Sequence, residues 1–158
     1  MNKPQGFIGI DPGSMGQICL FAPESKFIHF IPTAEHPVKI LAGIEAFKDS
    51  FNVRVILLEK VHSVFGTSAK SNFNFGYNVG IVNTLALLSQ VTVDFVQPKK
   101  WQKTIGVTKK GKEIKKEVAS ICSRLYPDAE IYGPKGGLLD GKSDALMIAH
   151  YAFLNYKV

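Results

Sequence analysis

The alternation of hydrophobic and polar positions predicts three strands near the start of the chain. Residues 7–11, 17–21 and 26–31 are short apolar runs rich in β-branched side chains. A Pro-Gly turn at 12–13 and the segment 22–25 separate these runs. Because short connections join neighbouring antiparallel strands, we expect the three to form an antiparallel meander.

Further along the chain, helical spacing alternates with two more apolar runs. Residues 53–58 form a nearly continuous apolar run, which is typical of a parallel strand covered on both faces, and 91–96 give a fifth strand. Helices are expected over about 37–51, 79–88, 113–126 and 140–153. The pattern predicts an α/β fold of the ribonuclease H-like kind. Its five-stranded mixed sheet has three antiparallel strands followed by two parallel ones, and helices flank it.

Composition restricts the class of protein. With 158 residues, 46% hydrophobic and 20% charged, the chain fits one domain spanning 1–158. An excess of 19 Lys and Arg over 13 Asp and Glu gives a formal charge of +6, which indicates an anionic partner such as nucleic acid. Cys19 and Cys122 lack metal-ligand or redox spacing, so we expect free thiols. Without a signal peptide or a run of about 18 apolar residues, we expect a soluble cytoplasmic protein that is not bound to a membrane.

Four acidic residues lie at the ends of predicted strands or on one face of a predicted helix, where the fold could bring their carboxylates together. Asp11 ends the first strand and Glu59 ends the fourth, so two parallel neighbouring strands would bring them to the same sheet edge. Asp140 and Asp144 lie four residues apart on one face of the last helix, where they repel each other unless a cation lies between them. Each acid alone has a simpler explanation, in a turn, at the surface or at a helix start. Together they suit magnesium or manganese, and two such ions can activate water for phosphodiester hydrolysis.

Lysines and aromatic rings are interleaved in the polar segments between these elements. Rings in such segments either fill a local hydrophobic pocket or stack on bases, and lysine clusters are either solvated faces or nucleic-acid surfaces. The basic charge of the whole chain favours nucleic acid in the second case. We therefore predict DNA contacts from Phe65, Lys70, Phe73, Lys99, Lys100, Trp101, Lys109, Lys115 and Lys116.

One sequence pattern near the C-terminus suggests a nucleotide-binding loop but lacks the structural context for one. Residues 136–143 fit the phosphate-loop pattern G-x-x-x-x-G-K-S, but that mechanism needs a buried strand before the loop and several βα units after it. Only Ile131 and Tyr132 precede the loop, and 15 residues follow Ser143. We expect no nucleotide cofactor.

Over essentially its whole length the chain resembles the RuvC-like Holliday-junction resolvases, in the compact form found in phages. Residues 9–14 match the first motif of that family, and 59–61 match its second. Residues 73–80 are similar to the stretch that opens the family's dimer helix. Residues 144–146, with Ala149, match its C-terminal acidic motif.

The resemblance implies a magnesium-dependent crossover junction endodeoxyribonuclease that acts as a homodimer. Such an enzyme cuts two symmetric strands of a four-way junction and leaves 5′-phosphate and 3′-hydroxyl ends. Asp11, Glu59 and Asp144, with Asp140, would hold two magnesium ions per active site, and manganese would substitute.

The resemblance also implies a lysine near the start of the 113–126 helix that steadies the scissile phosphate. Lys112 is the best match, with Lys115 and Lys116 close behind. Either His62 or Phe65 matches the family's junction-probing aromatic residue. The alternatives are a related nuclease for other branched DNA or structured RNA, and a junction-binding protein without activity. The four acids argue against the last of these.

Overall fold

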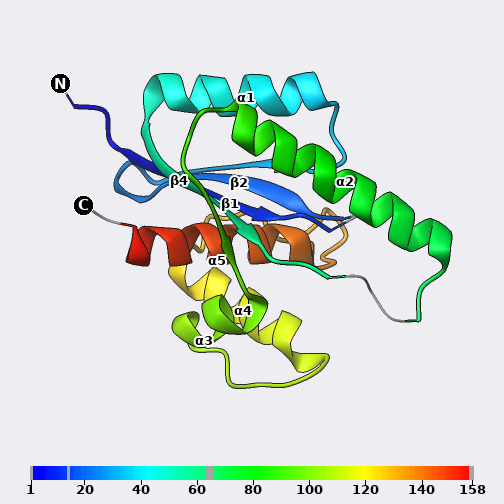
Figure 1. Cartoon of the computed structure of the whole chain (residues 1–158). Helices are drawn as coiled ribbons and strands as arrows, with labels where there is room; N and C mark the ends of the chain where they lie inside the picture. The colour runs from blue at the N-terminus through cyan, green and yellow to red at the C-terminus, as the bar shows by residue number, and fades with distance from the viewer. Residues whose placement is uncertain (1, 14, 63–65, 157–158) are drawn as a thin grey trace.

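The structure is a computed structural model that describes residues 2–13, 15–62 and 66–156 (Figure 1). Its strands are β1 (Gln5–Asp11), β2 (Gln17–Ala22), β3 (Phe27–Pro32), β4 (Asn52–Glu59) and β5 (Val93–Val96). Its α-helices are α1 (Pro37–Ser50), α2 (Ala69–Leu88), α3 (Pro98–Ile105), α4 (Glu113–Leu125) and α5 (Asp140–Asn155), and a 3-10 turn, η1 (Pro23–Ser25), joins β2 to β3.

The five strands form one mixed sheet in the order β3-β2-β1-β4-β5. Strands β1, β2 and β3 are antiparallel neighbours, while β4 pairs in parallel with both β1 and β5. Ile10 lies beside Leu58 in this register, so β1 and β4 end next to each other. The predicted sheet of three antiparallel strands followed by two parallel ones is confirmed.

Helices cover both faces of the sheet. Figure 1 shows α1 and α2 on one face and α3, α4 and α5 on the other. Alternate side chains serve the two cores: Ile8 and Leu58 are buried in the α1–α2 layer, whereas Phe7 and Leu57 are buried in the α3–α5 layer. This double coverage explains the nearly continuous apolar run of β4.

Helix α5 lies directly against β1 because Gly9 has no side chain. A Cβ at Gly9 would be 2.3 Å from both the Ala145 carbonyl oxygen and the Ala149 backbone nitrogen. A second close approach occurs where α5 begins, since a Cβ at Gly141 would be 2.3 Å from the Met15 carbonyl oxygen. These two glycines fix the distance between α5 and the end of β1, where Asp11 lies.

Two helices differ from the expectation. Helix α3 was not predicted, although Pro98 at its first turn and Gly106 just after it, with φ +96°, are typical helix boundaries. Helix α2 begins at Ala69, where the Ser68 side chain accepts a hydrogen bond from the Ser71 backbone. The polar, aromatic segment before residue 76 is therefore partly helical instead of a loop.

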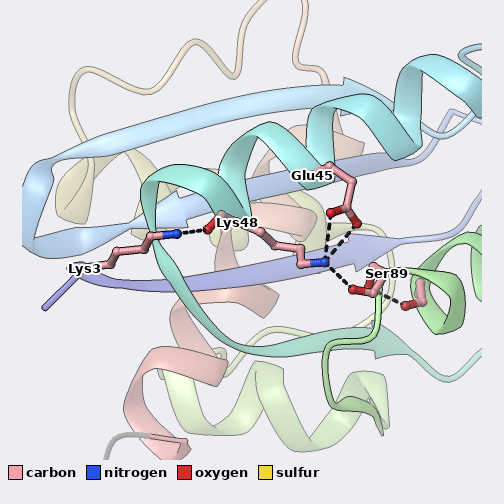
Figure 2. Close-up of polar contacts among 5 residues, drawn as sticks. Lys3, Glu45, Lys48 and Ser89 are labelled. Carbon is pink, nitrogen blue, oxygen red and sulfur yellow. Dashed lines mark hydrogen bonds and ion pairs between the residues drawn. The ribbon is translucent and has the colours of Figure 1, made fainter.

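At the other end of the strands from Asp11, two lysines form hydrogen bonds that connect neighbouring elements. Figure 2 shows the Lys48 ammonium donating to both carboxylate oxygens of Glu45, at 2.9 Å each, and to the Ser89 carbonyl oxygen at 2.6 Å. The Lys3 ammonium donates to the Lys48 carbonyl oxygen at 3.0 Å. These bonds join the end of α1 to the end of α2. Among the described residues, no helix combines the length and apolarity needed to cross a membrane.

Candidate active site

Three elements bring the four predicted carboxylates to one edge of the sheet. Asp11 ends β1 and Glu59 ends β4, and the two strands run in parallel side by side. Asp140 and Asp144 occupy the first two turns of α5. The backbone N–H of Gly13 donates to Asp11 Oδ1 at 3.2 Å, so the turn after β1 orients this carboxylate.

Burial and mutual repulsion perturb this group of acids. Burial raises the pKa of Asp144 to about 8, and the charges of Asp11, Glu59 and Asp140 contribute in the same direction. The pKa of Asp11 is also raised, chiefly by burial and further by Asp140. Charges that are buried and close to like charges need a cation for compensation. Strongly perturbed acids gathered at one place are also a mark of functional sites.

Lys115 is the lysine that lies among these acids. Its ammonium forms an ion pair with Asp140 Oδ2. The bond to Asp140 raises the pKa of Lys115, and the charges of Asp144 and Asp11 act in the same sense. With its side chain 66% exposed, Lys115 also remains accessible to a ligand from solution.

Lys112, the predicted catalytic lysine, is not the lysine that pairs with Asp140. It caps the start of α4, and in the described part of the chain it forms no ion pair with the four acids. Lys115 continues the buried stripe of Val118 and Cys122 toward the start of α5, because residues three and seven positions apart share one helix face. The structure therefore places Lys115 beside the acids, while the catalytic role predicted for Lys112 stays a prediction.

Trp101 contradicts the prediction that it contacts DNA. The side chain is completely buried between the sheet and the α3–α5 layer, so its ring has no surface on which a base could stack. Its indole Nε1 instead donates a hydrogen bond to Glu59 Oε1 at 2.8 Å. Burial raises the pKa of Glu59 to about 7, against the opposing effect of this bond, and the charge of Asp11 raises it further.

This contact was not predicted from the sequence, because lysines surround Trp101 and their pattern is typical of a basic surface. With α3 bounded by Pro98 and Gly106, Trp101 and Ile105 are four residues apart on one face. That spacing was the available signal that the ring points inward.

The other predicted DNA-contacting residues lie on the surface. Lys70, Phe73, Lys99, Lys100, Lys109 and Lys116 are all exposed. Lys116 pairs with Glu113 at 3.7 Å, and the Lys109 backbone N–H donates to Glu117 at 2.7 Å. Phe65 lies outside the described residues, so its predicted role is not addressed by the structure.

Two residues that the sequence did not single out accompany Lys99 and Lys100. These two residues are Lys60 and Phe95, and they line a surface pocket of about 580 Å³ together with Gln97, Lys99 and Lys100. Phe95 is 51% exposed on the edge strand β5. Lys60 directly follows Glu59, so this basic, aromatic pocket adjoins the carboxylate group.

Another surface pocket, of about 630 Å³, lies at the opposite end of the strands, around Lys3, Lys48 and Thr92. Its two lysines are engaged in the bonds of Figure 2. Its lining residues Gln5 and Asn52 lie at the starts of β1 and β4, whereas Asp11 and Glu59 lie at the ends of these strands.

No metal-ligand cluster is preformed within the described ranges, where no three His, Cys, Asp or Glu side chains are placed so that they could hold an ion. Three of the four acids already have partners, since Asp140 pairs with Lys115, Glu59 accepts from Trp101 and Asp11 accepts from the Gly13 backbone N–H. The donor set nevertheless fits a hard divalent cation, because every donor is a carboxylate oxygen and three of the acids have raised pKa values.

No protein-family model matches the chain, and no curated protein matches it by sequence. Solved structures do match. A Thermus thermophilus RuvC structure is 22% identical, with 96% of this chain and 97% of that chain covered and a TM-score of 0.60. T. thermophilus RuvC in complex with a Holliday junction substrate is 17% identical, with 94% and 95% covered and a TM-score of 0.61. The yeast mitochondrial Holliday junction resolvase is 14% identical, with 96% and 78% covered and a TM-score of 0.50. The chain thus has a RuvC-like fold, of the ribonuclease H-like kind.

Proposed function

We propose that this chain is a structure-specific endonuclease that resolves four-way DNA junctions by metal-dependent hydrolysis of phosphodiester bonds. One observation carries the proposal: on a RuvC-like fold, Asp11, Glu59, Asp140 and Asp144 meet at one sheet edge beside Lys115. A protein that only binds DNA gains nothing from buried carboxylates that repel phosphates. The substrate follows the two solved structures whose names include a Holliday junction. The cytoplasm is its proposed location.

Two magnesium ions, replaceable by manganese, are the proposed cofactors. Asp11, Glu59 and Asp144 would hold them, and Asp140 would join once released from Lys115. Bound ions of this kind activate a water and stabilise the leaving oxygen of a phosphodiester. The proposed products carry 5′-phosphate and 3′-hydroxyl ends.

The residues of the chain have separate tasks in this proposal. The turn at Gly13 and the indole of Trp101 orient the Asp11 and Glu59 carboxylates. The Lys115 ammonium, which neutralises Asp140 in the free protein, moves to a phosphate oxygen when DNA arrives. Because Lys115 is mostly exposed, this movement needs only side-chain rotation.

The DNA surface extends from the acids over two groups of residues. One is the pocket of Lys60, Phe95, Lys99 and Lys100, which combines positive charge with an aromatic ring. The other comprises Lys70 and Phe73 at the start of α2, with Lys109 and Lys116 near α4. Surface lysines of this kind hold phosphates without reading sequence.

Incubation of the protein with a labelled four-way junction and with a linear duplex of the same sequence, with and without Mg²⁺, tests the proposal. We expect paired cuts in the junction only, and only with the metal. Replication forks and structured RNA belong in the same assay, since faster cleavage of either would identify a related nuclease with a different substrate. Binding of the junction without any cleavage would contradict the proposed nuclease activity and support a non-catalytic junction-binding protein.

The metal-free protein is expected to lose thermal stability as the pH rises from about 5 to 8. The pKa of Asp144 is about 8 in the folded chain and near 3.8 as a free side chain. The folded state therefore binds this proton more tightly, and its advantage declines as the pH rises between these values. Asp144→Asn should flatten this dependence and raise the melting temperature at pH 8 by several degrees, since about 1 kcal/mol corresponds to about 2–4 °C at this chain length.

Thermal melting from pH 5 to pH 8, with chelator or with Mg²⁺, measures this effect. Mg²⁺ should raise the melting temperature of the native chain at pH 8 but have little effect on Asp144→Asn. Asp128→Asn is the matched control, because Asp128 is exposed and outside the carboxylate group. A native chain whose stability is the same at pH 5 and pH 8 would contradict the expected proton linkage.

The chain is also proposed to act as a homodimer through α2, since symmetric cutting needs two active sites. The core side of this helix packs Val82, Leu85 and Ala86. The opposite face carries an exposed stripe at positions three or four residues apart: Phe73, Tyr77, Gly80, Thr84 and Leu87. Phe73, Tyr77 and Leu87 are between 63% and 72% exposed, and this apolar face suits a second copy of the helix.

Gly80→Lys is therefore expected to convert a dimer into a monomer. Apart from its chain neighbours and the backbone of its own helix, no described atom lies within 4 Å of a Cβ at Gly80, so the monomer should tolerate the change. In a dimer, two lysines would face each other between the paired helices. Sedimentation at micromolar concentration measures the result. Ala42→Lys on the exposed part of α1 is the control and should remain dimeric. A native chain that is monomeric both free and on junction DNA would remove the proposed dimer.

A further inference from the structure

The hydrogen bond between Trp101 and Glu59 joins two parts of the chain that are 42 residues apart in sequence. Glu59 is the last residue of β4, and Trp101 lies in the first two turns of α3, just beyond the neighbouring strand β5. The donor is completely buried, whereas the acceptor is partly exposed at the sheet edge. A rigid core side chain thus bonds to a carboxylate at the solvent boundary.

The physical chemistry of the indole makes this contact specific. Its N–H can only donate, and a buried donor without a partner is strongly disfavoured. The Trp101 ring is packed in the same core cluster as Leu57, Val96 and Ala145, so it cannot turn away from the carboxylate. Glu59, by contrast, has three rotatable side-chain bonds and would otherwise sample several orientations at the strand end.

We propose that Trp101 is the positioning residue for Glu59, and that it holds one carboxylate oxygen so that the other faces the divalent cation. The inference rests on the proposed role of Glu59 as a metal ligand. Groups that donate hydrogen bonds to metal ligands in this way typically affect metal affinity or activity by about 10–100-fold. Trp101 was predicted to contact DNA, and we propose instead that it acts inside the protein by orienting Glu59.

The same short helix also carries DNA-facing residues. Lys99 and Lys100 directly precede Trp101 in α3 and line the basic pocket with Phe95. Helix α3 therefore presents lysines to DNA on one side and the Glu59 donor to the core on the other. Its position would therefore set both the proposed phosphate contacts and the orientation of the Glu59 carboxylate.

A first measurement tests the hydrogen bond without metal or DNA. Trp101 is the single tryptophan of the chain, so a ¹⁵N–¹H spectrum contains one indole signal from this protein. We expect this signal to be protected from exchange in the native chain, and to shift and exchange faster in Glu59→Leu, which lacks the acceptor. An indole signal that is unchanged in Glu59→Leu would overturn the inference.

A second measurement tests the consequence for the metal. Trp101→Phe keeps a large ring but removes the N–H, and calorimetric titration with Mn²⁺ is expected to show about 10–100-fold weaker binding. Phe21→Leu is the control for loss of core packing, because Phe21 is buried at the end of the sheet away from the carboxylates. It should lower the melting temperature without weakening metal binding.

Cleavage assays separate positioning from general damage. For Trp101→Phe the rate should approach that of the native chain when Mg²⁺ is saturating, whereas damage to the fold would lower the rate at every Mg²⁺ concentration. In a Glu59→Gln background, Trp101→Phe should cause no further loss of Mn²⁺ affinity. Native-like Mn²⁺ affinity in Trp101→Phe, with junction cleavage intact in the native chain, would overturn only this inference. A native chain that neither binds metal nor cleaves would overturn the proposed function together with it.

Discussion

Asp11→Asn is expected to bind four-way junctions at least as tightly as the native chain and to leave them uncut. The substitution removes a proposed metal ligand and one negative charge that faces DNA, while the shape of the side chain is kept. Loss of a direct ligand should exceed the roughly 10–100-fold effect of changes around a ligand. Because burial raises the pKa of Asp11, the neutral amide also relieves a disfavoured charge, so the fold should be retained. Binding is measured by titration and cleavage by single-turnover assay.

Glu59→Gln and Asp144→Asn are expected to behave in the same way, since their carboxylates belong to the same electrostatic group. Asp128→Asn, at an exposed position, is the control that changes charge equally and should cut normally. Near-normal cleavage by any one of the three active-site variants would remove that residue from the metal site. The other assignments would stand.

Lys115→Ala is expected to cut slowly even when every junction is bound. Lys115 is the lysine beside Asp140, and its proposed role is to stabilise charge that develops on the phosphate. Removal of one such donor typically lowers the rate on the order of 10²-fold. A residue that only holds DNA behaves differently: its loss weakens binding, lowers the salt slope by about one and is rescued by added protein.

Single-turnover cleavage across a protein titration distinguishes these roles. Lys99→Ala, Lys109→Ala and Lys112→Ala are the matched controls and should recover the native rate at high concentration or lower salt. If Lys115→Ala recovers while Lys112→Ala stays slow, then Lys112 is the catalytic lysine and the ion pair with Asp140 has only a structural role. If all four recover, the phosphate is stabilised by another group.

The strands and the acids were predictable because their signals are local. Asp11 and Glu59 each follow an apolar run directly, and parallel pairing necessarily carries both to one edge. The start of α2 was missed because its first turns are polar and contain aromatic rings, and the capping by Ser68 is weak as a sequence signal.

The roles of particular side chains were less predictable, since they depend on how elements pack. Whether Lys112 or Lys115 meets the acids depends on the rotation of α4 against α5, and sequence spacing gives a face but not its neighbour. Trp101 was misplaced for the same reason. From sequence alone, an aromatic residue among lysines could either stack on a base or be buried in the core. The packing of α3 against the sheet shows that Trp101 is buried.

The close packing of α5 on β1 through Gly9 also has a consequence for protein synthesis. A ribosome makes Asp11 and Glu59 well before the helix that supplies Asp140 and Asp144, and that helix fills the core beneath β1. A nascent chain that has not yet produced α5 can neither close this core nor assemble the acidic group, because domains of this kind fold as units. We therefore expect the group of four acids to form only after α5 has been translated.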